Sequence, residues 1–550
     1  MLEKLHTRLS PALLESLQEG YSRSLFVRDA LAGLTVAIVA LPLAMAIAIA
    51  SNMPPERGIY TAIVAGFLIS ALGGSRYQIG GPTAAFIVTV SLVAARHGYE
   101  GLVLATVMAG AMLIVFAFLG AGKLLKFIPY PVITGFTSGI ALLIFFTQIK
   151  EFLGLTYSGT AIDFLHRFQA YLGALHTTNP WALIVGLVSI GIIVATQRLV
   201  PRIPGPIVVV IISSLAVWAF DIPVETIEER FGALPVSLPI PTWSEFTFEK
   251  ARIVFPDAVT IAVLAGLESL LSAVVADGMT GSRHKSDAEL FGQGVANIAS
   301  GLFGGIPATG AIARTATNIR SGAKTPVAGM MHAVWLLLFL LLFAPLIVKV
   351  PLAALSAILM VVAWNMSEIK HVRKIWKAPR EDRAVLLTTF VLTVLVDLNF
   401  AVQVGIAMAA LLFINKLMQS TQIEDLVAVQ DDPDATSRKE IPDGVEVYEL
   451  SGPLFFGVAN KLLDTLRLLE KPPRVFILRM RHVPIVDAAG LHTLEEMARH
   501  CKRDGTVLIL SGVRPEVRRF LSKSGLERML GAENIVGHID DALRRAREIL

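Results

Sequence analysis

The sequence has little charge and almost no cysteine. Asp, Glu, Lys and Arg make up 17% of its 550 residues, whereas 54% are hydrophobic and the mean hydropathy is +0.64. In soluble proteins about a quarter of all residues are charged, so this composition argues against a water-soluble protein. The single cysteine, Cys501, excludes an intrachain disulfide and a cysteine-rich metal site.

Motifs for enzymatic chemistry are also missing from the sequence. It has no GxSxG, no Walker A sequence, no HExxH and no nucleotide fingerprint, and Gly301 to Gly305 lacks the ending of a phosphate loop. We therefore expect a protein that is not an enzyme, has no cofactor and no metal, and draws its energy from an ion gradient. The net charge of +4 is explained by basic loops of a membrane protein, so we expect no nucleic acid partner.

Long apolar runs are what the sequence has instead. Many approach or exceed about 18 residues, the length that spans a bilayer. Residues 1–28 form a polar segment before the first run and do not resemble a cleaved signal. Within 29–416 we count fourteen candidate spans: 29–50, 58–73, 80–95, 101–120, 128–149, 181–198, 203–220, 253–276, 288–304, 308–320, 325–348, 351–367, 383–397 and 399–416.

The basic residues between these runs predict the orientation of the chain. An even number of spans places both termini on one side. With the N-terminus in the cytoplasm, basic loops such as Lys370 to Arg383 lie inside and the mainly acidic loop 221–252 lies outside, as the positive-inside rule requires. We therefore expect a multi-pass protein of the inner (cytoplasmic) membrane, surrounded by membrane lipid, with cytoplasmic N- and C-termini.

Two of the candidate spans are short and begin with helix-breaking residues. Fourteen spans divide into two sets of seven that insert in opposite orientations. The third member of each set opens with Gly80-Gly81-Pro82-Thr83 or with Pro307-Ala308-Thr309-Gly310. Their helices would be about 24 and 20 Å long, short of the roughly 30 Å hydrocarbon core. The remaining length is then non-helical backbone, which a membrane protein tolerates where it is buried in protein or lines a cavity.

These two helix starts predict an anion site. Each N-terminus carries about half a positive charge, and proline suits a first turn because it lacks an N–H group. Arg314 follows one turn into the tenth span, where a charged residue costs at least about 2.5–3.5 kcal/mol and usually faces a cavity or a partner. The alternatives are that the glycines and prolines only kink or pack helices, and that Arg314 reaches out of a membrane face.

Glu268 is the other ionisable residue deep in a predicted span. It can be a proton carrier, a cation ligand or a permanent salt-bridge partner of Arg314. The electrostatics favour the first role. Two helix ends and Arg314 supply about two positive charges, an ionised Glu268 removes one, and protonation of Glu268 restores the balance for a dianion.

The C-terminal part has a different periodicity. A polar linker is predicted over 417–440, followed by a small α/β domain over 441–550 without a catalytic cluster. The predicted strands are 445–450, 474–480 and 506–511, and the predicted helices are 459–469, 488–502, 515–523 and 539–550.

Six short motifs give the chain a family resemblance. They are Leu41-Pro42, Arg57 to Tyr60, Gly73 to Arg76, Gly80 to Ala85, Gly135 to Gly139, and Asp277 to Gly281. With them the chain resembles the sulfate permease (SulP) family of anion transporters over almost its whole length. Its C-terminal part resembles a STAS domain.

The resemblance implies an α-helical polytopic membrane fold with a seven-plus-seven inverted repeat. Spans 1–4 and 8–11 would form a core domain and spans 5–7 and 12–14 a gate domain, in a homodimer to which the STAS domain contributes. Ala488 stands where phosphorylated STAS relatives carry a hydroxyl, so a phosphoswitch there is not expected. The implied substrate site consists of Thr83, Ala84, Gly310, Ala311, Ile312, Ala313 and Arg314, with Leu43 and Ile47 opposite.

The substrate is predicted from the apolar flank of this site. Leu43 and Ile47 suit a substrate with a hydrocarbon portion, so we expect proton-coupled symport of a carboxylate, such as a C4-dicarboxylate, by alternating access. The alternatives are sodium- or proton-coupled uptake of an inorganic anion such as sulfate or bicarbonate, and an anion channel. A nucleobase permease of the related fold would need acidic side chains where Arg314 stands.

Overall fold

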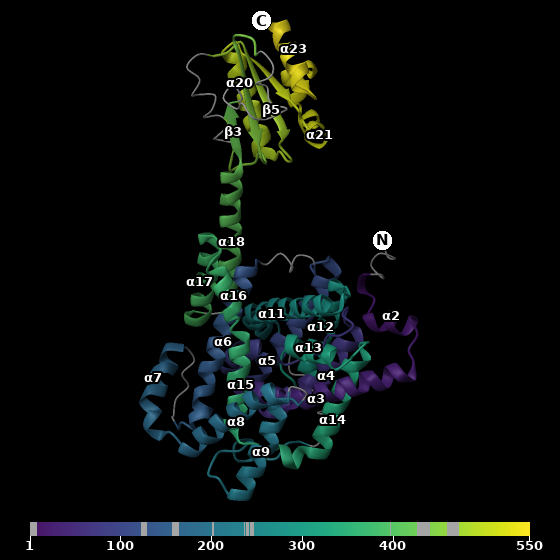
Figure 1. Cartoon of the computed structure of the whole chain (residues 1–550), viewed down its shortest axis with the longest axis vertical. Coiled ribbons are helices and arrows are strands. Elements are labelled where there is room, and N and C mark those ends of the chain that lie inside the picture. Colours follow the sequence, from purple (N-terminus) through teal and green to yellow (C-terminus); the bar gives the residue numbers. More distant parts are fainter. Residues whose placement is uncertain are drawn as a thin grey trace. The chain divides into compact units, whose positions relative to one another are not determined.

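The structure is a computed structural model of the chain. It divides into two compact units, Met1–Ile406 and Ala407–Leu550, which are taken separately below (Figure 1). The residues that the structure describes are 8–122, 129–156, 164–200, 203–235, 237, 241, 247–396, 398–425, 441–458, 462 and 472–550.

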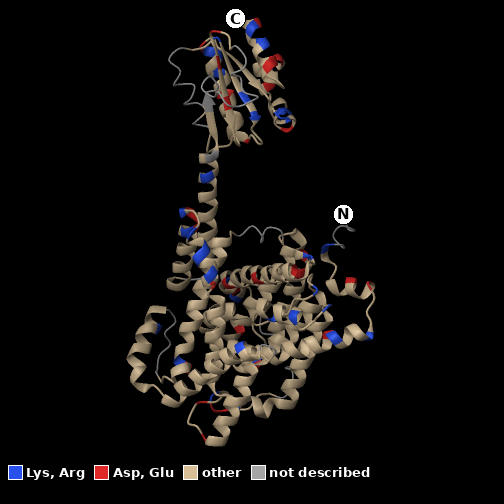
Figure 2. Ribbon diagram, in the orientation of Figure 1, with Lys and Arg blue, Asp and Glu red and all other residues tan. Residues whose placement is uncertain are grey.

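The first unit is built from helices, and Figure 2 shows few charged residues along most of them. Eight helices among the described residues are long and apolar enough to cross a bilayer. The α-helices, including α18, which continues into the second unit, are α2 (Ala12–Gln18), α3 (Arg23–Ala50), α4 (Pro55–Leu72), α5 (Ile87–Leu119), α6 (Tyr130–Leu153), α7 (Phe164–Ala174), α8 (Pro180–Leu199), α9 (Gly205–Phe220), α10 (Ile227–Phe231), α11 (Phe248–Thr280), α12 (Ser286–Leu302), α13 (Ile312–Arg320), α14 (Val327–Ile347), α15 (Leu352–Met366), α16 (Ile369–Ile375), α17 (Arg380–Leu395) and α18 (Leu398–Ser420).

Each of the fourteen predicted segments overlaps one of these helices. The third and fourth segments are joined in α5, and the backbone of Gly98 (φ 68°, ψ −179°) marks the break between them. The tenth segment is short, because α13 has 9 residues. The number of membrane crossings stays a prediction. The N-terminal segment 1–28 was predicted to end before the first span, but α3 already begins at Arg23.

The helices of the first unit form two groups. In one group α3, α4, α5, α11, α12, α13 and α14 pack on one another, and in the other α6 packs with α8, α15 and α17, with α9 on α8. The first group contains the helices of the predicted core domain, and the second contains those of the predicted gate domain except α18, the fourteenth predicted span. Helices α5 and α12 approach each other closely at Gly110 and Gly294. A Cβ at Gly110 would lie only 2.5 Å from the carbonyl oxygen of Gly294, so a larger residue would not fit there.

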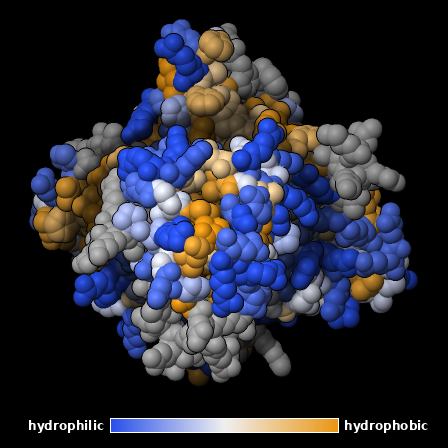
Figure 3. Space-filling model, turned by 90° about the horizontal axis from the view of Figure 1, so that it is seen from above, coloured by the Kyte–Doolittle hydropathy of each residue, from blue (hydrophilic) through white to orange (hydrophobic). Residues whose placement is uncertain are grey.

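The second unit contains a five-stranded sheet in the order β3-β4-β5-β6-β7. The strands β4 to β7 are parallel and β3 is antiparallel to β4. Helices α20 to α22 cover one face of the sheet and α23 covers the other. Figure 3 shows the whole chain from above, and hydrophilic residues cover much of the face that is visible there. The elements are β3 (Gln422–Asp425), β4 (Val445–Ser451), β5 (Val475–His482), α20 (Ala488–Arg503), β6 (Val507–Ser511), α21 (Pro515–Ser524), α22 (Leu526–Leu530), β7 (Ile535–Val536) and α23 (Ile539–Ile549).

The linker predicted over 417–440 needs correction. Helix α18 runs on to Ser420, and β3 pairs with β4, so the sheet begins inside the predicted linker. The polar composition concealed this strand, since an edge strand needs no apolar run. Residues 426–440, and the predicted helix 459–469 except Leu462, lie outside the described residues.

Candidate functional site

The two broken segments meet inside the core group. Strands β1 (Gly80–Gly81) and β2 (Thr309–Gly310) pair antiparallel, with Gly80 opposite Gly310 and Gly81 opposite Thr309. Both strands are buried. A Cβ at Gly310 would overlap the side-chain amide of Gln78, so this crossing depends on glycine. Extended backbone therefore occupies the interior of the helical unit at the two places where the sequence predicted it.

Hydrogen bonds from neighbouring helices replace those that a continuous helix would make. On α11, the Ser269 hydroxyl accepts from the Gly310 N–H at 3.0 Å, and the Thr309 hydroxyl donates to the carbonyl oxygen of Ala265 at 2.9 Å. Thr315 accepts from the Ile79 N–H at 3.1 Å. Backbone groups buried here are thereby paired, as an apolar surrounding requires.

A buried polar row on α12 provides further partners and was missed by the sequence analysis. Asn297 brackets Ala308, accepting from its N–H and donating to its carbonyl oxygen, both at 2.9 Å. Ser300 donates to the carbonyl oxygen of Ile306 at 2.7 Å. Their spacing of i, i+4, i+8 and i+11 places these polar residues on one face of the helix. This spacing is visible in the sequence and could have predicted the row. Its members are Glu289, Gln293, Asn297 and Ser300, all 0% exposed.

The helix starts lie directly after the two strands. Thr83 is extended, the 3₁₀ turn η1 (Ala84–Phe86) follows, and α5 begins at Ile87. Ala311 is also extended and donates its N–H to the carbonyl oxygen of Ile79 at 2.8 Å, after which α13 begins. Ala84 and Ala311 are buried, whereas Ile312 and Ala313, on the first turn of α13, are exposed.

Arg314 is buried in the core group and does not reach a surface. It is 4% exposed, and its Nη2 donates to the carbonyl oxygen of Pro82 at 3.0 Å. Its Nη1 has no hydrogen-bond partner and lies 2.7 Å from where a Cβ of Gly81 would be. The side chain thus crosses from α13 to the segment before α5 and joins the two broken helices. One of its donors remains available for a ligand.

Glu268 lies on α11 beside the other side of this segment. Its Oε2 accepts a hydrogen bond of 2.7 Å from the Thr83 hydroxyl. Glu268 and Arg314, both described, form no ion pair within 4.0 Å, so this structure does not contain the permanent salt bridge that the sequence left open. Among the described residues, no three His, Cys, Asp or Glu side chains form a cluster that could hold a metal.

The flanking residues of α3 are packed rather than open. Ile47 is 3% exposed and belongs to the same hydrophobic cluster as Ala84, and Leu43 packs against that cluster. Helix α3 packs on α13, and Arg314 of α13 bonds Pro82 in the segment before α5, so these three parts of the predicted site are neighbours.

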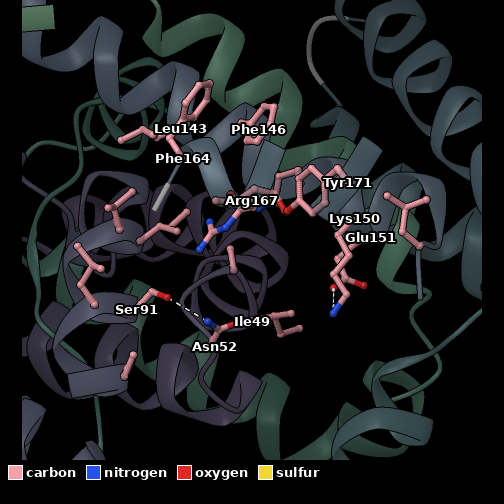
Figure 4. A pocket seen from close by; sticks show the side chains of 18 of the residues that line it. Ile49, Asn52, Ser91, Leu143, Phe146, Lys150, Glu151, Phe164, Arg167 and Tyr171 are labelled. Atoms are coloured by element: carbon pink, nitrogen blue, oxygen red, sulfur yellow. Dashed lines mark hydrogen bonds and ion pairs between the residues drawn. The ribbon is translucent and has the colours of Figure 1, made fainter. Parts of the chain in front are cut away.

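A cavity of about 1090 Å³ lies between the core and gate groups (Figure 4). Ile49 at the end of α3 and Ile87 at the start of α5 line it on the core side. Phe146 of the gate helix α6 lines the cavity as well, together with Arg167 of α7 and Arg230 of α10. The cavity therefore extends to the helix start that follows Thr83.

Arg230 ties the short helix α10 to the rim of this cavity. It donates to Glu151 at 2.8 and 2.9 Å and also pairs with Glu225. Burial acts to lower the pKa of Arg230, but the hydrogen bonds with Glu225 and Glu151 outweigh it and raise that pKa. The α10 backbone also bonds the connection between α14 and α15, where the Ile227 N–H donates to Val350 at 3.1 Å.

The fold and the site together define a polytopic α-helical membrane transport protein with two broken helices at its centre and a separate α/β domain. The sequence comparisons agree with this class. The Sulfate permease family matches residues 26–389, and the STAS domain matches residues 436–542. The chain belongs to the sulfate permease family of anion transporters.

Individual relatives cover nearly all of the chain. YvdB of Bacillus subtilis (strain 168) is 42% identical over 525 residues, which are 95% of this chain and 98% of YvdB. The bicarbonate transporter BicA of Picosynechococcus is 30% identical, and the match covers 94% of this chain and 94% of BicA. The murine Slc26a9 anion transporter, solved in the inward-facing state, superposes with a TM-score of 0.87 at 19% identity, over 98% of this chain and 94% of Slc26a9.

Proposed function

We propose that this protein is a secondary active transporter that carries a small anion together with a proton by alternating access. The observation that carries the proposal is the position of Glu268. Its carboxyl contacts Thr83 at the start of the first broken helix and is not ion-paired with Arg314. The charge of Glu268 is therefore free to change while the β1–β2 crossing stays intact.

The proposed anion site consists of the two helix starts and Arg314. The partial positive charges of α5 and α13 converge on the crossing, and an anion oxygen would give the unpaired Nη1 of Arg314 a partner. The residues in this role are Thr83, Ala84, Gly310, Ala311, Ile312, Ala313 and Arg314.

Charge balance gives the reason for proton coupling. When Glu268 is ionised, its negative charge offsets the positive charge of Arg314. Only the partial positive charges of the two helix ends then remain to attract the substrate. A proton on Glu268 leaves Arg314 uncompensated and adds one positive charge to the site. Substrate and proton then favour each other's binding, and this linkage is reciprocal.

Two substrate classes remain in the proposal. The apolar wall formed by Leu43 and Ile47 supports a carboxylate with a hydrocarbon portion, such as a C4-dicarboxylate, as the first candidate. Ile47 is 3% exposed, however, and a compact oxyanion fits a packed wall equally well. The family match and the relative named as a bicarbonate transporter support an inorganic anion, sulfate or bicarbonate, as the second candidate.

The placement of the chain follows from the same reasoning. We infer an inner membrane protein with both termini in the cytoplasm, so that the cavity beside α7 and α10 opens outward. Homodimerisation with a contribution from the STAS domain also belongs to the proposal. The core group would move against the gate group and expose the crossing to each side in turn.

Uptake into proteoliposomes tests the proposal. Labelled fumarate, sulfate and bicarbonate are supplied separately, with a pH gradient or a sodium gradient imposed across the membrane. We expect saturable uptake of one of these anions that a pH gradient drives above equilibrium. A requirement for sodium would replace the proton as the coupling ion, and a non-saturating current without any co-ion would indicate a channel.

A further inference from the structure

Glu289 is a buried carboxyl that the proposed mechanism does not use. It lies on the first turns of α12 and is 0% exposed. Its Oε2 accepts from the N–H groups of Gly74 and Ser75 at 3.0 and 3.1 Å. Its Oε1 accepts from the amides of Gln78 and Gln293 at 2.8 and 3.0 Å. All four contacts are N–H donors, and such contacts favour the ionised carboxylate.

No cation compensates a charge on Glu289. It has no ion pair within 4.0 Å in the described part of the chain, and the charged side chains of the loop 73–78, of α2 and of the start of α12 nearest to it pair with other residues. His332 of α14 lies beside Gly66, about two turns away from Gly73 along α4. The surrounding ion pairs are Arg76 with Glu19 and Glu15, Lys285 with Glu15, and Asp287 with Arg8.

Two amide oxygens next to Glu289 have no hydrogen-bond partner. They are Oε1 of Gln78 and Oε1 of Gln293, on side chains 2% and 0% exposed. An ionised carboxylate cannot donate to either oxygen, whereas a protonated carboxyl can donate to one of them after that amide turns over. Burial opposes the charge and the four N–H donors favour it, so the site can hold the carboxyl in either state.

Gln78 connects this carboxyl to the proposed anion site. Its amide donates to Glu289 on one side and lies against Gly310 on the other, so close that a Cβ at Gly310 would overlap it. Gly310 is paired with Gly80 in the β1–β2 crossing. If the side-chain amide of Gln78 rotated by half a turn, its Nε2 and Oε1 would exchange places. The polar atom that faces the β1–β2 crossing would then change.

We propose that Glu289 is a second proton-binding group of the core and that its protonation state changes anion affinity through Gln78. The inference rests on the proposed anion site but not on the proton role of Glu268. Glu289 takes its proton from the side of the membrane on which α2 lies.

The N-terminal helix α2 covers the loop that contacts Glu289. Helix α2 lies over the loop 73–78, where the Ala12 N–H donates to the carbonyl oxygen of Gly73 at 2.9 Å. Its Glu15 and the following Glu19 pair with Arg76 of that loop. The proposed path of the proton to Glu289 therefore passes the contact between α2 and this loop.

Infrared difference spectroscopy on the reconstituted full chain tests for the proton directly. The Glu268→Gln variant serves as background, and bulk pH is changed stepwise. We expect a band of a protonated buried carboxyl that titrates, disappears in Glu289→Gln and persists in Asp287→Asn. Asp287 is the matched control because it is a carboxyl on the same helix that pairs with Arg8 at 3.0 Å. A spectrum unchanged by Glu289→Gln would overturn the inference.

Anion affinity gives the second readout. Sulfate and fumarate keep their charge near neutral pH, so a pH dependence of their Kd comes from the protein. One linked proton changes Kd by up to about tenfold per pH unit. We expect the slope that remains in Glu268→Gln to vanish when Glu289→Gln is added, and an unchanged slope would contradict the inference.

Two further outcomes keep the proposals separate. If wild type binds none of sulfate, fumarate and bicarbonate while the band still titrates, the proposed function fails and proton binding by Glu289 stands. If Glu289→Gln does not fold, Glu289→Asp replaces it. This variant keeps a titrating carboxyl with a shorter reach, so its band is expected to shift, and an unshifted band would assign the signal to another residue.

Discussion

The Thr83 hydroxyl donates a hydrogen bond of 2.7 Å to Glu268, while the neighbouring carbonyl of Pro82 accepts from Arg314 at 3.0 Å. Two adjacent residues of one extended segment are therefore held by side chains of opposite charge. Because these side chains do not pair with each other, a change of charge on Glu268 acts on the segment that leads into α5. This geometry contains no salt bridge between Glu268 and Arg314, which leaves the proposed change of charge on Glu268 to experiment.

The first prediction concerns Glu268→Gln. Glutamine resembles the protonated carboxyl, so the variant should bind and exchange substrate while losing accumulation driven by a pH gradient. Counterflow and gradient-driven uptake in proteoliposomes separate the two activities. Normal accumulation by the variant would disprove the proton role. A folding defect would instead indicate that Glu268 is a structural counter-charge of Arg314.

The second prediction concerns Arg314→Ala. Removal of a charge-assisted donor costs about 1.5–3 kcal/mol, so affinity should fall about ten- to a hundredfold. Arg320→Ala is the matched control, since Arg320 is exposed at the last residue of the same helix. Equilibrium binding of labelled anion to detergent-purified, folded protein measures both variants. Equal affinities would remove Arg314 from the anion site.

The third prediction concerns the glycine at the strand crossing. Gly310→Ala places a methyl group on the Gln78 amide, and overpacking of this kind costs about 1–3 kcal/mol. Gly278→Ala in α11 meets no atom within 4 Å and should be neutral or stabilising. Thermal unfolding in detergent compares the two. A Tm for Gly310→Ala at or above that of Gly278→Ala would show that the crossing is not tightly packed.

Features that depend on local chemistry were predictable from the sequence. The two helix breaks could be predicted from Gly80 to Thr83 and from Pro307 to Gly310, because glycine and proline change the backbone at their own positions. Apolar runs similarly gave the helices that form the core and gate groups. Alternation of strand and helix gave the α/β domain.

Features that depend on partners distant in sequence were not predictable. Glu289 contacts Gly74 across more than two hundred residues, and only the assembled core shows that its neighbours are N–H donors. The absence of an ion pair between Glu268 and Arg314 likewise shows only in the assembled core, and the role of Glu268 as a proton carrier stays a prediction. Helices α7 and α10 lie in connections whose residues had no long apolar run, so hydropathy gave no signal.

The fourth prediction concerns the division between the two units. The first unit ends at Ile406 and contains every residue of the proposed anion site. A chain truncated after Lys416 should therefore bind substrate with an affinity within a few-fold of wild type, although its turnover or folding yield can change. Binding to the truncated, monodisperse protein is the measurement. Complete loss of binding in folded protein would show that the STAS domain takes part in the site.

The last prediction uses Cys501, the only cysteine of the chain, as a probe of the STAS domain. Cys501 lies on α20 and is 4% exposed. Burial, with a smaller contribution from Asp504, raises the pKa of this thiol to about 12. The thiolate is the reactive form, so a maleimide should label native protein slowly at pH 8 and denatured protein rapidly. The introduced thiol of Lys523→Cys, at an exposed position of α21, should react rapidly in both states.

The same shift makes a contribution of Cys501 to the stability of the STAS domain depend on pH. An unfolded thiol loses its proton near pH 8.5, whereas the buried thiol retains it up to about pH 12. The unfolded state therefore binds fewer protons between these values, and the contribution of Cys501 to stability is full below pH 8.5 and is lost as pH rises. Urea unfolding of the wild-type STAS unit at pH 8 and pH 10 should show lower stability at pH 10. Cys501→Ala should lessen this difference, and an undiminished difference would mean that the thiol titrates alike in both states.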